Sequence, residues 1–400
     1  MIIGIIKEGK TPPDKRTALI PEDCKFLKQQ YPGIEVIVHK SPHRAFGDEE
    51  YRNAGCVLKS DLKEAEIIFG VKEVELEDLI PNKTYLFFSH TIKKQTYNRK
   101  LLQTILERNI RLIDYECLRK DGERILGFGR YAGIVGAYNG LLAYGKRSGA
   151  YSLKAAHRCK NKAELFQELK KVELPKGFRI ALSGLGRVAG GAIEILQALQ
   201  IPQWKPKKYL NEAGKEIAFT QLSVVDYFKK PDESSFEQKE VFQHPERFRS
   251  NFMPFAEKTD LYISCHYWDD RGPMIFSKEE LGSPDFRIQT IADISCDIAG
   301  PIPSTLRPST IDDPIYEVNK RELKEVENVS ENSVTVMAVD NLPCELPRDA
   351  SESFSRDLLE KVLPSLLGQA DPKIIEGATI AAEGKLMPDF SYLRDFVNGD

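Results

Sequence analysis

The chain has 400 residues, of which 41% are hydrophobic and 29% are charged, and its formal net charge is −3. A chain about two to three times the usual domain length should form two cores, and this balance of residue types excludes a disordered or fibrous protein. The small negative charge argues against nucleic acid or anionic lipid as the main partner, so we expect a small-molecule partner.

The sequence shows neither a targeting signal nor a metal-binding pattern. Its first apolar run is interrupted by Gly4 and is too short for a secretory signal, and the weakly charged stretch 131–144 is too short for a membrane span. The seven cysteines stand at wide spacings, without a CxxC pair or histidines at metal spacing. We therefore expect a cytoplasmic protein that does not enter membranes, with reduced thiols and no bound metal.

Apolar runs of strand type alternate with helical patterns through the first 114 residues. Strands are predicted over 2–6, 35–39, 67–71, 84–88 and 111–114, and helices over 21–30, 48–54 and 96–108. Such alternation predicts βαβ units and a largely parallel sheet. Because ligands of parallel sheets bind at the carboxyl ends of the strands, functional residues are expected directly after these strands.

Seven glycines lie between Gly127 and Gly149, in a stretch otherwise patterned as a helix. Each glycine inside a helix costs about 1 kcal/mol relative to alanine, so a compensating interaction is needed. Close packing of this helix against another backbone at a domain junction would provide it, and a loose loop is the alternative. We place the first domain boundary near Gly133, with a long connecting helix after it.

The second half repeats the α/β pattern. Strands are predicted over 179–183, 261–264, 289–293 and 334–339, and a helix over 350–363, followed by a tail with several glycines and prolines. The polar stretch 211–249 is interpreted as an insertion of irregular structure and unassigned role. The prediction is an α/β protein with two Rossmann-like domains, whose parallel sheets flank a central cleft. Residues 1–133 and 341–400 would form the substrate-binding domain, and residues 134–340 the dinucleotide-binding domain.

A glycine motif marks the expected dinucleotide site. The run Ile180–Leu182 leads into Gly184, Gly186 and Ala189, and an apolar helix pattern follows. Gly184 permits a tight turn, Gly186 lets the backbone approach a pyrophosphate, and the helix N-terminus offers unpaired N–H groups. A plain tight turn is the alternative. The predicted cofactor-binding residues are Gly184, Gly186, Arg187, Val188, Ala189, Lys207 and Asp293.

The choice between NAD and NADP is open. An acidic residue that would hold the adenosine ribose is expected about 20 positions after the glycines, and none is found between Trp204 and Leu210. Lys205, Lys207 and Lys208 stand there instead. A basic cluster could receive the 2′-phosphate of NADP, or it could be a solvated surface run, so the prediction leans slightly to NADP.

Two ionisable residues follow strands of the first half. Lys72 and Glu73 come after the strand that ends at Val71, and His90 comes after the strand that ends at Phe88. Lysine and histidine suit carbonyl and imine chemistry, because burial or a neighbouring charge can tune either one to exchange protons near neutral pH. Taken alone, Lys72 is more readily interpreted as a surface lysine and His90 as a satisfied polar residue.

At these residues the chain resembles the alanine dehydrogenase and transhydrogenase-like superfamily, and within it the lysine-forming saccharopine dehydrogenases and lysine:2-oxoglutarate reductases. The segments that carry the resemblance include KEGKTPPDKRTALIP (7–21), GVKEVE (70–75), FFSHTIKKQ (87–95), SCHYWD (264–269) and DNLPCELPRDAS (340–351). They extend over nearly the whole chain. The resemblance implies NAD(P)-linked interconversion of saccharopine with L-lysine and 2-oxoglutarate, with hydride transfer at an imine.

The family's functional residues can be carried over to matching positions. The resemblance implies that Lys72 and His90 transfer protons, Lys72 at the imine step and His90 at hydration and collapse of the carbinolamine. It implies substrate binding by Arg16, Glu73, Lys93, Glu116, Arg124, Phe128, Asp340 and Arg348. The direction of flux, the state as monomer or homo-oligomer, and any regulator stay open.

Two other functions are kept as alternatives. An alanine dehydrogenase-like or other opine-type reductase would share Lys72, His90 and Arg16, but it would need fewer charged residues around its substrate. A catalytically silent nucleotide-binding sensor is the third possibility, and intact Lys72 and His90 disfavour it.

Overall fold

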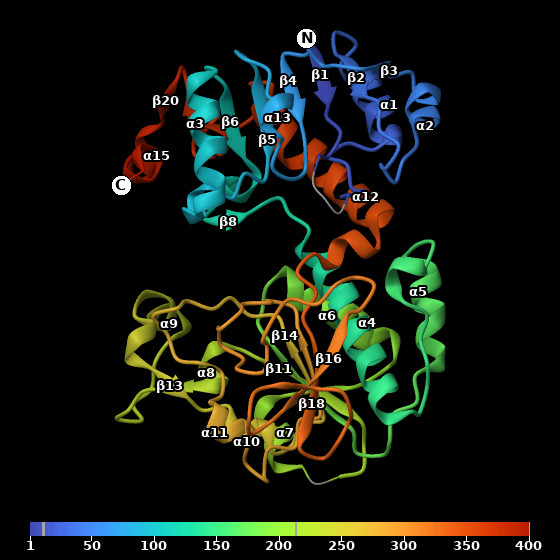
Figure 1. Ribbon diagram of the computed structural model, residues 1–400, viewed down its shortest axis with the longest axis vertical. Helices are drawn as coiled ribbons and strands as arrows, with labels where there is room; N and C mark the ends of the chain where they lie inside the picture. Colours follow the sequence, from blue (N-terminus) through green and yellow to red (C-terminus); the bar gives the residue numbers. More distant parts are fainter. Residues whose placement is uncertain (10–12, 213, 400) are drawn as a thin grey trace. The chain divides into compact units, whose positions relative to one another are not determined.

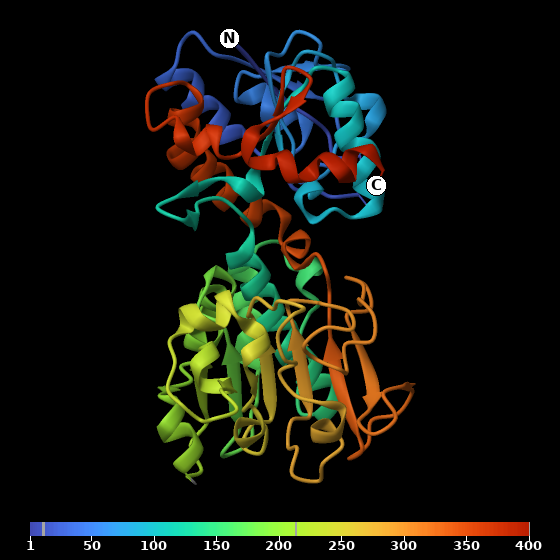
Figure 2. The same cartoon turned by 90° about the vertical axis from the view of Figure 1, so that its left-hand side faces the viewer.

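The computed structural model describes residues 1–9, 13–212 and 214–399. Residues 10–12 of the first family-like segment and residue 213 of the predicted insertion therefore lie outside the described part. The chain divides into two compact units, Met1–Phe128 with Pro347–Asp400, and Gly129–Leu346 (Figures 1 and 2). Each unit has its own sheet.

Unit 1 is built on a sheet that, within the described residues, has eight strands. Its strand order is β20, β19, β6, β5, β4, β1, β2, β3. The bounds are β1 Ile2–Ile5, β2 Glu35–His39, β3 Val57–Lys59, β4 Ile67–Phe69, β5 Thr84–Phe87, β6 Arg111–Asp114, β19 Thr379–Ala382 and β20 Lys385–Leu386. The strands from β1 to β6 pair in parallel, whereas β19 and β20 pair antiparallel. The carboxyl ends of β4, β5 and β6 thus meet at one edge.

The helices of unit 1 pack on a core formed largely by Ile, Val, Leu and Phe side chains. They are α1 Pro21–Gln30, α2 Asp48–Asn53, α3 Arg99–Glu107, α12 Pro347–Asp357, α13 Leu363–Leu366, α14 Lys373–Glu376 and α15 Arg394–Asn398. Short helical turns include η2 Thr91–Lys93, η3 Thr96–Asn98, η4 Tyr115–Cys117 and the π-helical segment Leu358–Val362. The hairpin β7 Arg119–Lys120 and β8 Glu123–Arg124 follows β6.

Unit 2 contains a second sheet of eight strands among the residues that the structure describes. Its order is β10, β11, β9, β14, β15, β18, β16, β17. The bounds are β9 Arg179–Ser183, β10 Gln203–Trp204, β11 Ala218–Leu222, β14 Leu261–Ser264, β15 Thr290–Asp293, β16 Ile315–Asn319, β17 Glu325–Val326 and β18 Ser333–Met337. The six strands from β10 to β18 are parallel, and β16 and β17 are antiparallel. The predicted α/β class with two mostly parallel, Rossmann-like sheets is confirmed.

The helices of unit 2 are α4 Gly129–Ser148, α5 Lys162–Glu168, α6 Arg187–Ala198, α7 Pro206–Asn211, α8 Val224–Tyr227, α9 Gln238–Gln243, α10 Met253–Ala256 and α11 Lys278–Leu281. The small antiparallel pair β12 Phe228–Lys229 and β13 Arg249–Ser250 lies outside the main sheet. Aromatic residues dominate much of the core, among them Tyr209, Phe252 and Tyr262.

The glycine-rich stretch forms α4, and close helix packing compensates for its glycines. An ideal Cβ at Gly133 would lie 1.9 Å from the Val188 carbonyl oxygen, and one at Gly191 would lie 1.9 Å from the Arg130 carbonyl oxygen. The helices α4 and α6 therefore cross backbone to backbone, glycine against main chain on both sides. The close packing predicted for this stretch is confirmed, and it holds α4 against the glycine motif within unit 2.

One sequence interpretation is wrong, and several strands were missed. The stretch 211–249 is not an irregular insertion, because β11 pairs in parallel with β9 along its whole length. Its short run AFTQL was masked by polar neighbours, whereas pairing inside a sheet buries even Thr220. In the C-terminal tail, the strand β19 extends the first sheet beside β6, and it was not predicted. The strands β3 and β16, at or near sheet edges, were also missed.

Candidate functional site

The ends of three neighbouring strands in unit 1 carry most of the predicted site residues. Lys72 and Glu73 follow β4, His90 and Lys93 follow β5, and Glu116 follows β6. The register aligns Phe69 with Leu86 and Phe87 with Asp114, so the residues after these strands emerge at one edge of the sheet. The structure thus brings these five residues to one region of unit 1.

Glu73 and His90 are in direct contact. The Glu73 Oε1 atom lies 2.5 Å from His90 Nδ1, and both side chains are mostly buried. Burial raises the pKa of Glu73, but the hydrogen bond and charge of His90, with the charge of Lys72, outweigh it and leave this pKa below its ordinary value. His90 has φ +53°, in the left-handed region that non-glycine residues rarely adopt. This backbone conformation and the stack on Phe88 fix the direction of the imidazole.

One carboxylate oxygen of Glu116 contacts two cations, and the other has no hydrogen-bond partner among the described residues. Its Oε1 accepts a hydrogen bond from Arg124 Nη2 at 3.0 Å and lies 4.0 Å from Lys93 Nζ. The other oxygen, Oε2, is buried, and among the described residues it has no hydrogen-bond partner. A buried carboxylate oxygen without a donor is costly, so this geometry suits a cationic or N–H ligand.

Arg16 lies in unit 1 as well, but its charge is already partly used. Its Nε and Nη2 atoms donate to the two carboxylate oxygens of Asp14 at 3.0 and 2.6 Å, and both side chains are buried. The guanidinium stacks on Phe128 at 4.3 Å. Phe128 in turn packs on Phe88, the neighbour of His90. Arg16 and Phe128 therefore adjoin the strand-end cluster through aromatic contacts.

Two further predicted substrate residues lie on α12 and in unit 2. Arg348, in α12, donates to Glu50 and to the Ala45 carbonyl, and it stacks on Phe46. These contacts tie α12 to the segment around α2. Asp340 is exposed and belongs to unit 2, where it follows β18.

The glycine motif forms a strand–turn–helix in unit 2. Gly184 follows β9 with φ +101°, and an ideal Cβ there would lie 2.5 Å from the Cys265 carbonyl oxygen, so only glycine fits. Gly186 caps α6, and a Cβ there would meet nothing within 4 Å. Arg187 and Val188 begin the helix, and Ala189 is fully buried. Open space before the N-terminus of a 12-residue helix fits a pyrophosphate, because the first N–H groups of a helix have no acceptor within the helix.

Asp293 ends β15 on the same sheet, but its carboxylate is engaged inside the protein. It accepts hydrogen bonds from the hydroxyls of Ser295 and Thr305, each at 2.7 Å, and burial raises its pKa. Neighbouring strand ends continue this polar region, since Ser183 Oγ lies 2.8 Å from His266 Nδ1. Burial lowers the pKa of His266 to about 4, which keeps the imidazole neutral.

Lys207 is not brought to the glycine turn. It lies in α7, at the end of the unit opposite α6 in both views (Figures 1 and 2). The segment after α7 contacts Arg179 at the start of β9, whereas the turn follows the end of β9. Because β10 and α7 intervene, the strand beside β9 is β11, and the usual ribose position comes after Leu222. The run AFTQL, which forms β11, was the sequence signal from which this strand could have been predicted.

Two carboxylates missed by the sequence reasoning support the strand-end cluster. Glu8 accepts the backbone N–H groups of Val71 and Lys72, both at 2.8 Å. Asp114 accepts those of Ser89 and Glu116, at 3.0 and 2.7 Å. Asp114 ends an apolar strand run and Glu8 lies two residues after one, and that position was the only signal for them.

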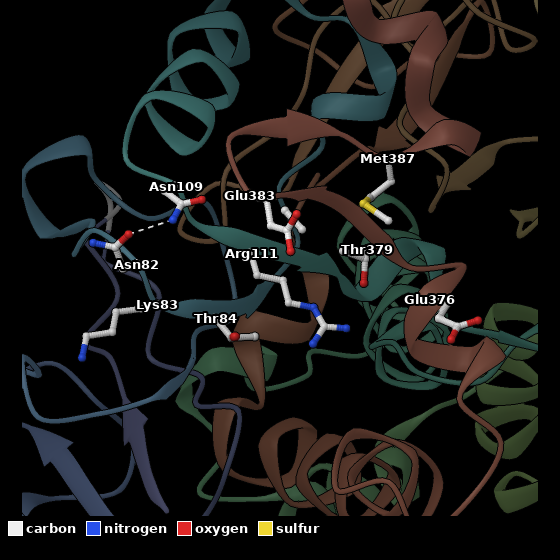
Figure 3. A pocket seen from close by; sticks show the side chains of 10 residues that line it. Asn82, Lys83, Thr84, Asn109, Arg111, Glu376, Thr379, Glu383 and Met387 are labelled. Atoms are coloured by element: carbon white, nitrogen blue, oxygen red, sulfur yellow. Dashed lines mark hydrogen bonds between the residues drawn. The ribbon is translucent and has the colours of Figure 1, made fainter.

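A separate pocket of about 360 Å³ lies at the other edge of this sheet (Figure 3). Thr84 and Arg111, the first residues of β5 and β6, line it together with Glu376, Thr379 and Glu383. Since His90 and Glu116 follow the opposite ends of these strands, the pocket is distinct from the strand-end cluster.

The comparisons with known proteins agree with the sequence resemblance. Residues 4–135 match the alanine dehydrogenase/PNT N-terminal domain. The chain is 29% identical to an alpha-aminoadipic semialdehyde synthase of Arabidopsis thaliana and 28% identical to the mitochondrial one of Mus musculus, each over 98% of this chain. It covers 41% and 47% of these relatives, so it spans less than half of their length.

A relative of similar size is the saccharopine dehydrogenase [NAD(+), L-lysine-forming] of Candida glabrata, which is 28% identical over 91% of this chain and 93% of its own. Among solved structures, an L-alanine dehydrogenase matches with a TM-score of 0.66 at 16% identity, covering 99% of this chain and 100% of that one. A transhydrogenase from Sinorhizobium meliloti matches with a TM-score of 0.60 at 14% identity, over 97% of this chain and 100% of that one. These structures show the fold.

The chain thus has the fold of alanine dehydrogenase and carries the N-terminal domain shared with transhydrogenase. Its homologues are alpha-aminoadipic semialdehyde synthases and lysine-forming saccharopine dehydrogenases, and the resemblance inferred from the sequence is confirmed. In the described part of the chain, every helix is too short or too polar to cross a membrane. The same residues contain no group of three or more His, Cys, Asp or Glu placed to hold a metal ion.

Proposed function

We propose that the chain is an NAD(P)-dependent oxidoreductase that interconverts saccharopine with L-lysine and 2-oxoglutarate. The observation that carries this proposal is the strand-end cluster of unit 1, in which Lys72, the Glu73–His90 pair and Glu116 meet at one sheet edge. Ionisable groups at the carboxyl ends of parallel strands are placed for chemistry, and a relative of similar size is named saccharopine dehydrogenase.

Unit 2 would hold the dinucleotide, at the turn formed by Gly184, Gly186 and the first turn of α6. Gly186 presents open space, and the helix N-terminus presents N–H groups to the pyrophosphate. When bound, the nicotinamide accepts or supplies the hydride at the carbon of the 2-oxoglutarate moiety. We propose that the dinucleotide is NAD or NADP, and that the protein acts in the cytoplasm.

Lys72 and His90 would transfer the protons. The Glu73 carboxylate, bonded to Nδ1, fixes the imidazole so that Nε2 is the atom that gives or takes a proton at the carbinolamine. Lys72, one residue before Glu73, would exchange the proton of the imine nitrogen. Glu73 serves both groups, because its charge lies near each of them.

Glu116 and Arg16 would distinguish the two halves of the substrate. The unpartnered Glu116 Oε2 suits an amino group of lysine. Arg16 presents its charge beside Phe128, but the edge formed by Nε and Nη2 is taken by Asp14. We therefore propose that Arg16, stacked on Phe128, attracts a carboxylate of 2-oxoglutarate by its positive charge, rather than through the Nε–Nη2 fork.

The decisive experiment follows oxidation of NADPH and of NADH with lysine and 2-oxoglutarate, and separately with pyruvate and ammonia. Turnover with the first pair supports the proposal, and turnover with only the second supports an alanine dehydrogenase-like enzyme. Lys72→Met and His90→Gln should each lower kcat by about 10²- to 10⁴-fold, with dinucleotide affinity unchanged. The exposed-site variants Lys63→Met and His43→Gln are the matched controls. Dinucleotide binding without turnover of any amino acid would favour a silent sensor.

A further inference from the structure

Glu8 occupies a position between two strands where backbone pairing stops. Pairing of β1 with β4 ends where the Ile6 N–H donates to the Phe69 carbonyl. The next N–H groups on the β4 side, those of Val71 and Lys72, donate to Glu8 Oε1 and Oε2, each at 2.8 Å. The side chain therefore replaces the missing strand and satisfies two amides with one carboxylate.

The turn that Glu8 holds carries two proposed functional residues. Lys72 is one of the bonded residues, and Glu73, the next one, contacts His90 Nδ1 at 2.5 Å. On its other side the turn is bonded to β5, because the Phe88 N–H donates to the Val71 carbonyl. Removing the carboxylate would free one side of the turn and shift Lys72, Glu73 and, through Glu73, the imidazole of His90.

The charges around Glu8 come from its own segment and from η4. Asp14 and Arg16 lie along the chain after it, and Tyr115 faces it from the end of β6. The pKa of Glu8 is raised to about 8 by burial of its carboxyl and by the charge of Asp14, against the two backbone hydrogen bonds and Arg16. Ionised Glu8 accepts at both oxygens, whereas protonated Glu8 carries a hydrogen on one of them.

We propose that Glu8 is a positioning residue for the strand-end cluster, which touches neither substrate nor cofactor but fixes Lys72 and the Glu73–His90 pair through the backbone of residues 71 and 72. This inference rests on the proposed function, because its effect on turnover presupposes roles for Lys72 and His90. It predicts a loss mainly in kcat, because the turn held by Glu8 carries the proton-transfer residues, whereas Glu116, proposed to bind lysine, follows another strand.

The test compares Glu8→Gln with Glu8→Asp and with Asp23→Asn, the removal of a part-buried carboxylate in α1 that bonds Ser355. Glutamine keeps one acceptor but turns an amide donor toward the second N–H, and aspartate keeps the charge but is one methylene too short to reach both. In Glu8→Gln we expect kcat to fall about 10- to 100-fold, with KM values within about threefold and unchanged dinucleotide affinity. We expect the wild-type kcat to change with pH near 8, where Glu8 titrates, and this change should be absent in Glu8→Gln. Asp23→Asn should behave as wild type.

A second readout does not depend on turnover. Nitrogen-15 spectra of the His90 ring report the bond to Glu73, and we expect them to shift in Glu8→Gln and Glu8→Asp but not in Asp23→Asn. Wild-type kcat, pH profile and His90 spectrum in Glu8→Gln would overturn the inference, as would a rise in KM alone or an equal loss in Asp23→Asn. If the wild-type chain did not turn over lysine and 2-oxoglutarate, the proposed function would fail and the His90 spectra would decide the role of Glu8. If Glu8→Gln does not fold, Glu8→Asp carries both readouts.

Discussion

At the scale of single residues, the clearest prediction concerns the buried Glu116 Oε2 atom, which has no donor among the described residues. Glu116→Gln should mainly raise KM for lysine, because a charged hydrogen-bonding partner contributes about 1.5 to 3 kcal/mol, or roughly 10- to 150-fold. KM for 2-oxoglutarate should change little. Steady-state kinetics with each substrate varied in turn measure this.

The control for Glu116 is Glu123→Gln, an exposed carboxylate in the adjacent β8. If Glu116→Gln raised KM for 2-oxoglutarate and left lysine unaffected, the orientation proposed for the two halves of saccharopine would be reversed. No change for either substrate would remove Glu116 from the substrate site.

The sequence could predict which ionisable residues stand at strand ends, because strand periodicity and residue type are local. It could not predict which groups these side chains contact in the folded protein. The pairing of Arg16 with Asp14 and the two-amide contact of Glu8 depend on how loops return over the sheet. Lys207 shows the same limit, since its distance along the chain from Gly186 suited a ribose contact but β10 and α7 carry it to the opposite end of the unit.

At the scale of elements, the position of α7 gives a prediction about cofactor choice. Lys207→Ala should leave the ratio of NADPH to NADH affinity within about twofold, because α7 lies far from the glycine turn. Gly186→Val should abolish binding of both dinucleotides while the fold survives, since added atoms there meet only open space within the protein. Calorimetric titration with each dinucleotide tests both variants. A selective loss of affinity for NADPH in Lys207→Ala would show that Lys207 does contact the cofactor.

The crossing of α4 and α6 gives a second prediction at this scale. Gly191→Ala should lower the free energy of unfolding by about 3 kcal/mol or more, because its Cβ would lie 1.9 Å from the Arg130 carbonyl oxygen. Gly190→Ala is the matched control in the same helix. A Cβ at Gly190 meets nothing within 4 Å, so alanine there should stabilise by up to about 1 kcal/mol. Equal effects of the two substitutions in urea unfolding would contradict the backbone-to-backbone crossing.

Elements inside strong periodic patterns were predicted closely, and α1, β2, β6, β9 and β14 have the expected bounds. The strands β11 and β19 were missed because their short runs carry little local signal. Each is specified by the strand that it joins, β9 in one unit and β6 in the other. The sequence shows the glycines of α4, but it could not predict that α4 packs against α6.

At the scale of the whole molecule, each unit has its own core, and each contains a buried glutamic acid whose pKa is raised to about 8, Glu8 in unit 1 and Glu345 in unit 2. Glu345 is buried, accepts a hydrogen bond from Asn139 Nδ2 at 2.8 Å, and has its pKa raised to about 8, chiefly by burial. Two separate cores are expected to unfold in two calorimetric transitions, so the pH dependence of each can be followed separately.

The sign of this dependence follows from proton binding. The folded state holds the Glu345 proton up to about pH 8, whereas an unfolded glutamic acid loses it near 4.5, so unfolding releases a proton between these values. The stabilisation is therefore complete below pH 4.5 and is lost as pH rises through about 8, by about 5 kcal/mol. Calorimetry from pH 5 to 9 should show the unit 2 transition falling in wild type and staying nearly level in Glu345→Gln, whereas the exposed-site control Glu246→Gln should follow wild type. A Glu345→Gln variant with the wild-type slope would show that Glu345 is ionised in the folded protein.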